Sequence, residues 1–194
     1  MKKLFIALLS MLALANASEV KVASVEFNPK FMQLDNNING IVDAVTLAAK
    51  NDAKLIVLPE AATTGYIYKD RKQLEPYLDT IPGKTTAALA KVTQKYHTYV
   101  AVGIIEKDPE TGLVYNSAAL IGPDGYIGKY RKNQLNASDN KWSSRGNLSF
   151  PVFDTEIGKI ALLICYDDMH LQSLLLPNLR GADILAYITS SDIL

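Results

Sequence analysis

The sequence is poor in the residues that form disulfides and metal sites. Its 194 residues include one cysteine, Cys165, and two histidines, His97 and His170. A lone cysteine cannot form an intrachain disulfide, and these three residues cannot supply the four ligands of a structural zinc site. We therefore expect no metal centre and no cofactor. The question that remains is whether Cys165 is a small buried apolar residue or a nucleophile.

Several other functional signatures are missing. No G-x-S-x-G motif accompanies the histidines, so a Ser/His/Asp hydrolase is not indicated. We interpret His97 as structural and His170 as an exposed or capping residue. No glycine-rich phosphate-binding loop occurs. The 20 basic and 20 acidic side chains balance, which argues against a nucleic-acid or anionic-membrane surface.

The first seventeen residues differ in character from the rest. A basic start is followed by the apolar run LFIALLSMLALA, and Ala15 and Ala17 form the small-x-small pattern of a signal peptidase site. The run is shorter than the roughly 20 residues of a membrane-spanning helix. We expect a signal peptide at residues 1–17, a domain at residues 18–194 without a stable membrane span, and a periplasmic location. An N-terminal anchor or a buried helix is the alternative.

The rest of the chain has the pattern of a mixed α/β sheet protein. Apolar or alternating runs predict strands at residues 20–27, 53–58, 99–106, 113–121, 126–130, 151–155, 159–166 and 182–190. Helical spacing predicts helices at residues 33–50, 85–97 and 169–179. Residues 131–150 have no clear period, and a long irregular segment inside a compact domain is often functional.

Three chemically different side chains follow three of the predicted strands: Glu60, Lys132 and Cys165. In open α/β sheets, ligands bind beyond the carboxyl ends of strands. A carboxylate, an ammonium group and a thiol together can perform nucleophilic acyl chemistry. Each residue also has a structural interpretation: a buried apolar cysteine, a glutamate that caps the turn after Pro59, and a lysine on a solvated basic face. Spacing alone does not decide between these interpretations.

Four segments, taken in order, resemble the nitrilase superfamily of carbon–nitrogen hydrolases: LIVLPEAATTGY, GKYRKNQL, VFDTEIGKIALLICYDD and PNLRGADILAYITSS. The resemblance covers nearly all of residues 18–194 and implies a four-layer αββα sandwich. It also implies a catalytic triad in which Glu60 is the general base, Lys132 the catalytic lysine and Cys165 the nucleophile. Lys132 and the backbone N–H of Tyr166 would stabilise the developing negative charge. Lys132 and the start of the following helix would favour the thiolate.

The sequence departs from the family pattern at several positions. Gln134 replaces a histidine that many members carry, and the loop NASDNKWSSRGN lacks their second glutamate. Asp139 is the nearest acidic candidate for that role, and a turn-forming aspartate is its alternative. Trp142 either lines the substrate pocket or covers the core. Tyr66 and Tyr166 complete the expected substrate-binding residues.

The chain is also shorter than the domains it resembles. The resemblance therefore implies that the last strands and helix of the second half are absent, as in a fragment, a truncated product or one piece of a split protein. An apolar sheet edge would then be exposed, which predicts poor solubility.

By analogy with the family, we expect hydrolysis of an amide, ahead of a nitrile or carbamoyl compound, through a cysteine thioester. A small-molecule substrate and a homodimer of the full-length protein are the expected partners. Two alternatives stay open: an N-acyl transferase, and a non-catalytic relative that acts as a binding or assembly module.

Overall fold

The computed structural model describes residues 19–66 and 68–190, and the signal peptide expected at residues 1–17 lies outside this part. Its strands are β1 (Val22–Ser24), β2 (Leu55–Val57), β3 (Tyr99–Lys107), β4 (Val114–Gly122), β5 (Gly125–Arg131), β6 (Val152–Thr155), β7 (Gly158–Ile164) and β8 (Ile184–Ile188). Its α-helices are α1 (Leu34–Lys50), α2 (Arg71–Leu74), α3 (Lys84–Tyr96) and α4 (Leu171–Leu179). Short 3₁₀ helices span η1 (Glu75–Tyr77), η2 (Asp139–Lys141) and η3 (Cys165–Met169).

The strands form two sheets. In the larger sheet the order is β1-β2-β3-β4-β5, with β1, β2 and β3 parallel and the β3–β4 and β4–β5 pairs antiparallel. In the smaller sheet, β7 pairs with β6 antiparallel and with β8 parallel. Parallel pairing places the carboxyl ends of β2 and β3 at one edge, and those of β7 and β8 likewise end together.

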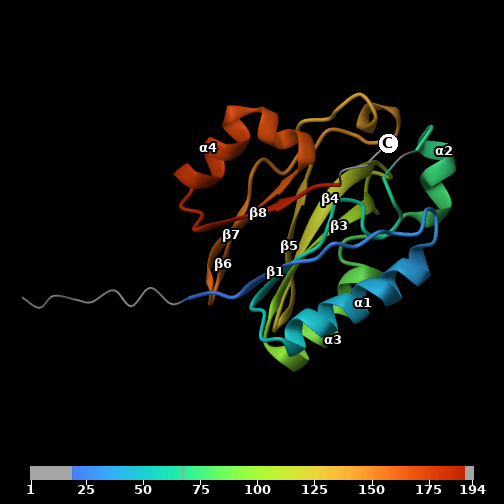
Figure 1. The fold of residues 1–194 in the computed structure, drawn as a ribbon. Helices are drawn as coiled ribbons and strands as arrows, with labels where there is room; N and C mark the ends of the chain where they lie inside the picture. The colour runs from blue at the N-terminus through green and yellow to red at the C-terminus, as the bar shows by residue number, and fades with distance from the viewer. Residues whose placement is uncertain (1–18, 67, 191–194) are drawn as a thin grey trace, which may run out of the picture.

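The layers follow an αββα arrangement (Figure 1). Helices α1 and α3 cover the outer face of the larger sheet, and α4 lies on the far side, against the smaller sheet. The sequence periodicities explain this order. On β3, Val100, Val102 and Ile104 face the helices, whereas Tyr99 and Ala101 face the second sheet. This alternation is expected for a strand covered on both faces.

Two apolar clusters hold the layers together. The first lies between the helices and the larger sheet: Ile41 and Val45 of α1 and Leu89 of α3 pack on it. The second lies between the two sheets, where Leu120 and Leu162 are buried. The mixed α/β fold predicted from the sequence is therefore confirmed, and the site described below lies at one end of the layers.

The predicted strands and helices begin and end within a few residues of the observed ones. Helices α2 and η1 were not predicted, because their residues RKQLEPY carry no apolar periodicity. Strand β7 ends at Ile164, before the predicted end at residue 166, and Cys165 opens the 3₁₀ turn η3 instead. In the described part of the chain, no helix is long and apolar enough to cross a membrane.

Large apolar side chains are exposed on β8 and beside it. Within the described residues β8 pairs with β7 alone, and Leu185 and Tyr187 on β8 are exposed. The neighbouring helix α4 adds the exposed side chains of Leu171 and Leu179.

Candidate active site

Three strand ends bring Glu60, Lys132 and Cys165 to one place. Glu60 follows β2, Lys132 follows β5 and Cys165 follows β7. The Nζ atom of Lys132 lies 2.9 Å from Oε1 of Glu60. The Cys165 thiol lies close enough to the Glu60 carboxylate for the carboxylate to raise the pKa of the thiol. The structure therefore places an ammonium group in contact with a carboxylate, with the thiol near both.

The backbone around Glu60 is held tightly against β3. The N–H of Gly103 donates to the carbonyl oxygen of Pro59 at 3.2 Å, and the N–H of Ala62 donates to the carbonyl of Gly103 at 3.1 Å. A Cβ atom on residue 103 would lie 2.6 Å from the Cα atom of Glu60, so only glycine permits this approach. The carboxylate that results is buried and fixed in position.

The two oxygens of Glu60 have different partners. Oε1 accepts hydrogen bonds from Lys132 and from Nδ2 of Asn116 at 2.7 Å. Oε2 accepts the backbone N–H of Ser190, just beyond β8, at 3.3 Å. Because the two short contacts both involve Oε1, Oε2 is the oxygen better able to exchange a proton.

A second carboxylate completes the surroundings of Lys132. Oδ2 of Asp139, in η2, lies 2.7 Å from the lysine Nζ, and both side chains are fully buried. Its other oxygen, Oδ1, accepts the hydroxyl of Tyr66 at 2.9 Å. The backbone N–H of Asn136 donates to Oδ2 at 3.2 Å. Asp139 thus belongs to the same buried cluster of charges as Glu60 and Lys132.

Burial and the neighbouring charges together set the pKa values of Glu60 and Lys132. Burial raises the pKa of Glu60, and the nearby Lys132 ammonium opposes this effect only in part. Burial also disfavours a charged lysine, but the carboxylates of Glu60 and Asp139 outweigh it and raise the pKa of Lys132. Lys132 therefore stays protonated, while Glu60 is a stronger base than an ordinary glutamate.

The backbone at Cys165 is unusual. Its φ angle is 44°, in the left-handed region that favours glycine. A sharp, strained turn between a strand and a helix is also how other hydrolases expose a nucleophile. The half-buried thiol sits at such a turn between β7 and η3.

The expectation of a stabilised thiolate is wrong for the structure described here. Burial raises the pKa of the Cys165 thiol, and the negative charge of Glu60 raises it further. Lys132 lowers it by less, because its ammonium is already paired with two carboxylates. The resting group is therefore a thiol, and a base is needed to activate it.

The two acids after the cysteine, Asp167 and Asp168, lie in the first turn of η3. The sequence favours acids at this position, because a helix dipole stabilises negative charge at its start. The two side chains also have specific surroundings: Asp167 is fully buried, and Asp168 accepts the Tyr187 hydroxyl at 2.9 Å. Oδ2 of Asp167 accepts the Tyr130 hydroxyl at 2.8 Å, and Oδ1 accepts the Gln134 backbone N–H at 2.9 Å. Asp167 therefore ties the cysteine turn to the segment that follows Lys132.

The expected substrate-binding aromatic residues have separate positions. The ring of Tyr66 lies 5.7 Å from the Lys132 Nζ atom, and its edge meets Trp142. Trp142 is buried in an apolar cluster with Tyr68 and Ile105, so of its two interpretations the structure favours a core residue. Tyr166 is exposed and packs on His170. Only Tyr66 contacts the cluster of charges.

Some residues of the site were missed by sequence reasoning. Asn116 is the third residue of β4 and contacts Glu60. Thr189 and Ser190 follow β8 and contact Cys165 and Glu60, respectively. Strand position could have indicated Thr189 and Ser190, because they follow a strand parallel to β7. Nothing in the sequence pattern distinguishes Asn116 from a turn or edge residue.

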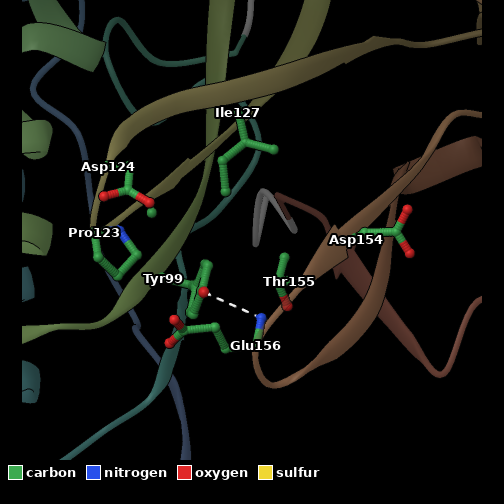
Figure 2. Close-up of a pocket in the computed structure, with 8 residues that line it drawn as sticks. Tyr99, Pro123, Asp124, Ile127, Asp154, Thr155 and Glu156 are labelled. Carbon is green, nitrogen blue, oxygen red and sulfur yellow. Dashed lines mark hydrogen bonds between the residues drawn. The ribbon is translucent and has the colours of Figure 1, made fainter.

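The cavity in Figure 2 is not this site. It has a volume of about 430 Å³ and lies between the two sheets, lined by residues that include Tyr99, Ile127 and Glu156. Tyr99 begins β3 and Glu156 precedes β7, so the cavity is at the opposite strand ends from Glu60 and Cys165. No group of three histidine, cysteine or carboxylate side chains in residues 19–66 and 68–190 is arranged to hold a metal ion.

Comparison with known proteins identifies the family. The family model for carbon-nitrogen hydrolases matches residues 21–193, and the chain belongs to this family. A nitrilase of Pyrococcus abyssi is 37% identical over 169 residues, which cover 87% of this chain and 64% of the nitrilase. A citrullinase of Francisella tularensis is 31% identical over 182 residues, covering 89% of this chain and 62% of the citrullinase.

Solved structures agree on the fold. A Saccharomyces cerevisiae member of the nitrilase superfamily superposes with a TM-score of 0.78 at 27% identity, covering 90% of this chain and 65% of that one. A carbon-nitrogen hydrolase of Helicobacter pylori superposes with a TM-score of 0.80 at 22% identity, covering 90% of this chain and 61% of that one. At this identity, the likeness supports the fold alone. The chain thus spans less than two thirds of the length of these relatives.

Proposed function

We propose that this protein hydrolyses a non-peptide carbon–nitrogen bond through a thioester on Cys165. The observation that carries the proposal is the 2.9 Å contact between Lys132 Nζ and Glu60 Oε1 beside the thiol. Membership of the carbon-nitrogen hydrolase family supports it independently. A buried base, a fixed positive charge and a thiol at a strained turn are the parts that such a reaction needs.

In the first half of the reaction, the Sγ atom of Cys165 attacks the carbonyl carbon of the substrate. Glu60 accepts the thiol proton as the bond forms, which suits a carboxylate of raised pKa. The carbonyl oxygen becomes an oxyanion, and Lys132 and the backbone N–H of Tyr166 stabilise it. The carbon–nitrogen bond then breaks, and the nitrogen leaves as ammonia or an amine with the proton from Glu60.

In the second half, water hydrolyses the thioester. Glu60 takes one proton from the water molecule while the water oxygen attacks the thioester carbon. The carbon–sulfur bond breaks, the acid product leaves, and the thiol is restored with the proton held by Glu60. Lys132 stays protonated throughout, because Glu60 and Asp139 both raise its pKa.

We propose small amides as the substrates. Relatives of this chain are named nitrilase, citrullinase and formamidase, and two of these three act on amide or carbamoyl nitrogen. An amide gives a thioester directly. A carbamoyl compound gives a thiocarbamate, and a nitrile gives a thioimidate that becomes a thioester by taking up water and losing ammonia. The common readout is therefore the release of ammonia.

The test is a panel of aliphatic amides, carbamoyl compounds and nitriles, with ammonia as the measured product. We expect release by the wild-type protein and loss of at least about a thousand-fold in Cys165→Ala and in Glu60→Gln. Glu156→Gln is the matched control, because this exposed glutamate lies at the opposite strand ends. Unchanged release by Cys165→Ala would refute the proposal. No release by the wild type from any compound favours the binding module instead.

A further inference from the structure

We propose that Asn116 is a positioning residue that holds Glu60 and Asp139 on either side of the Lys132 ammonium. The inference rests on the proposed function, since it concerns how the base of that reaction is kept in place. Asn116 is the third residue of β4 and is fully buried.

The side chain of Asn116 bridges the two carboxylates. Its Nδ2 atom lies 2.7 Å from Oε1 of Glu60 and 3.3 Å from Oδ1 of Asp139. An amide nitrogen carries two hydrogens, so one can be directed to each carboxylate. The reverse orientation would point the amide oxygen at two acceptors, and the contacts therefore fix which atom is the nitrogen.

The backbone of Asn116 holds the third member of the cluster and the loop beside it. The N–H of Lys132 donates to the carbonyl oxygen of Asn116 at 2.8 Å. The N–H of Asn116 donates to the hydroxyl of Ser143 at 3.0 Å, in the loop that follows Asp139. One residue therefore contacts the base, the lysine and the second carboxylate, which come from three separate segments of the chain.

The Asn116 bridge stabilises two buried carboxylates that lie close together. Two buried carboxylates repel each other, and Lys132 alone must offset both. The Asn116 amide supplies neutral donors that stabilise their charged forms, and it occupies Oε1 of Glu60, so that Oε2 stays available for proton transfer. The Oδ1 atom of Asn116 has no hydrogen-bond partner among the described residues. A buried acceptor without a partner costs stability, so packing alone does not explain an asparagine here.

The test compares two neighbouring buried residues of β4. Asn116→Leu keeps the approximate volume and removes the donors. Ser117→Ala is the matched control, because the Ser117 hydroxyl bonds to Glu106 at 2.6 Å and not to the cluster. Two quantities are measured: the pH dependence of kcat/KM, and the titration of the Glu60 carboxyl carbon by isotope-edited NMR, with Glu60→Gln to assign the signal.

We expect Asn116→Leu to lower kcat by about ten-fold or more and to move the acidic limb of kcat/KM to higher pH by roughly one pH unit. The Glu60 titration should move in the same direction, and Ser117→Ala should move neither. An unchanged Glu60 titration in a folded Asn116→Leu protein would overturn the inference.

The two failures can be told apart. If the wild type releases no ammonia, the proposed function fails, while the NMR titration still decides the role of Asn116. If Asn116→Leu does not fold, Asn116→Ser replaces it in the same comparison, because its hydroxyl is too short to bridge both carboxylates. A Glu60 titration that moves in Asn116→Ser supports the inference, and one that does not move overturns it.

Discussion

The Nζ atom of Lys132 lies 2.7 Å from Oδ2 of Asp139, with both side chains fully buried. Both carboxylate oxygens of Asp139 also accept hydrogen bonds, from the side chains of Tyr66 and Asn116 and from the backbone N–H of Asn136. We propose that the role of Asp139 is to fix the lysine that would stabilise the oxyanion. A second carboxylate opposite Glu60 also keeps Lys132 charged, which an oxyanion-binding group requires.

Removing Asp139 should destabilise the fold. Asp139→Ala leaves the buried Lys132 ammonium with one carboxylate, and breaking a buried ion pair costs about 3–5 kcal/mol in the free energy of unfolding. Urea denaturation measures the change. Asp35→Ala is the control, because the Asp35–Lys84 pair is exposed and should change stability little. Equal effects of the two substitutions would show that Asp139 does not hold Lys132.

The pH dependence of activity should show the raised pKa of Glu60. The reaction needs the ionised carboxylate, so kcat/KM falls as the pH falls through that pKa. Because burial raises the pKa of Glu60, the midpoint of the acidic limb should lie above the value of an ordinary glutamate, about 4.3. A pH–rate profile on the most active amide measures it. A midpoint at or below the ordinary value would contradict the buried environment of the base.

The thiol should titrate above the value of a free cysteine, about 8.5. Burial and the Glu60 charge both raise the pKa of Cys165. The rate of alkylation by iodoacetamide as a function of pH reports this directly, since the chain has no other cysteine. Glu60→Gln removes the neighbouring charge and should lower the midpoint, whereas Glu156→Gln should leave it in place. A wild-type midpoint below 8.5 would instead support the thiolate inferred from the sequence.

Adjacent aspartates after the cysteine should differ in their effects. Asp167→Ala leaves the Tyr130 hydroxyl and the backbone N–H groups of Ile164 and Gln134 without their acceptor. We expect a loss of about 3 kcal/mol in the free energy of unfolding, together with a lower kcat, because the cysteine turn loses its anchor. Asp168→Ala, which removes one exposed contact to Tyr187, should change both little. The opposite order of effects would contradict this assignment.

The sequence predicted the fold well because its signals are local. The apolar runs that became β3, β4 and β7 and the periodic residues of α1 and α3 are each visible within a short window. The positions of Glu60, Lys132 and Cys165 after strands could also be inferred, because parallel strands end at a common edge.

The rest of the site depends on contacts between distant segments. Asn116 is separated from Glu60 by 56 residues. The contact between their side chains forms only once β4 lies beside the loop after β2. The hydrogen bonds of Asp167 could not be predicted either, because its partners Tyr130 and Gln134 come from another segment. The pKa of Cys165 depends on burial and on a paired lysine, neither of which a linear pattern contains.

The most direct test of the central claim is the mass of the protein during turnover. After mixing with an excess of the best amide and quenching in acid, intact-mass spectrometry should detect a population heavier by the mass of the acyl group. Peptide mapping should place that group on Cys165, and Cys165→Ala should not carry it. Ammonia release with no acylated protein at any quench time, or an acyl group on another residue, would contradict the account.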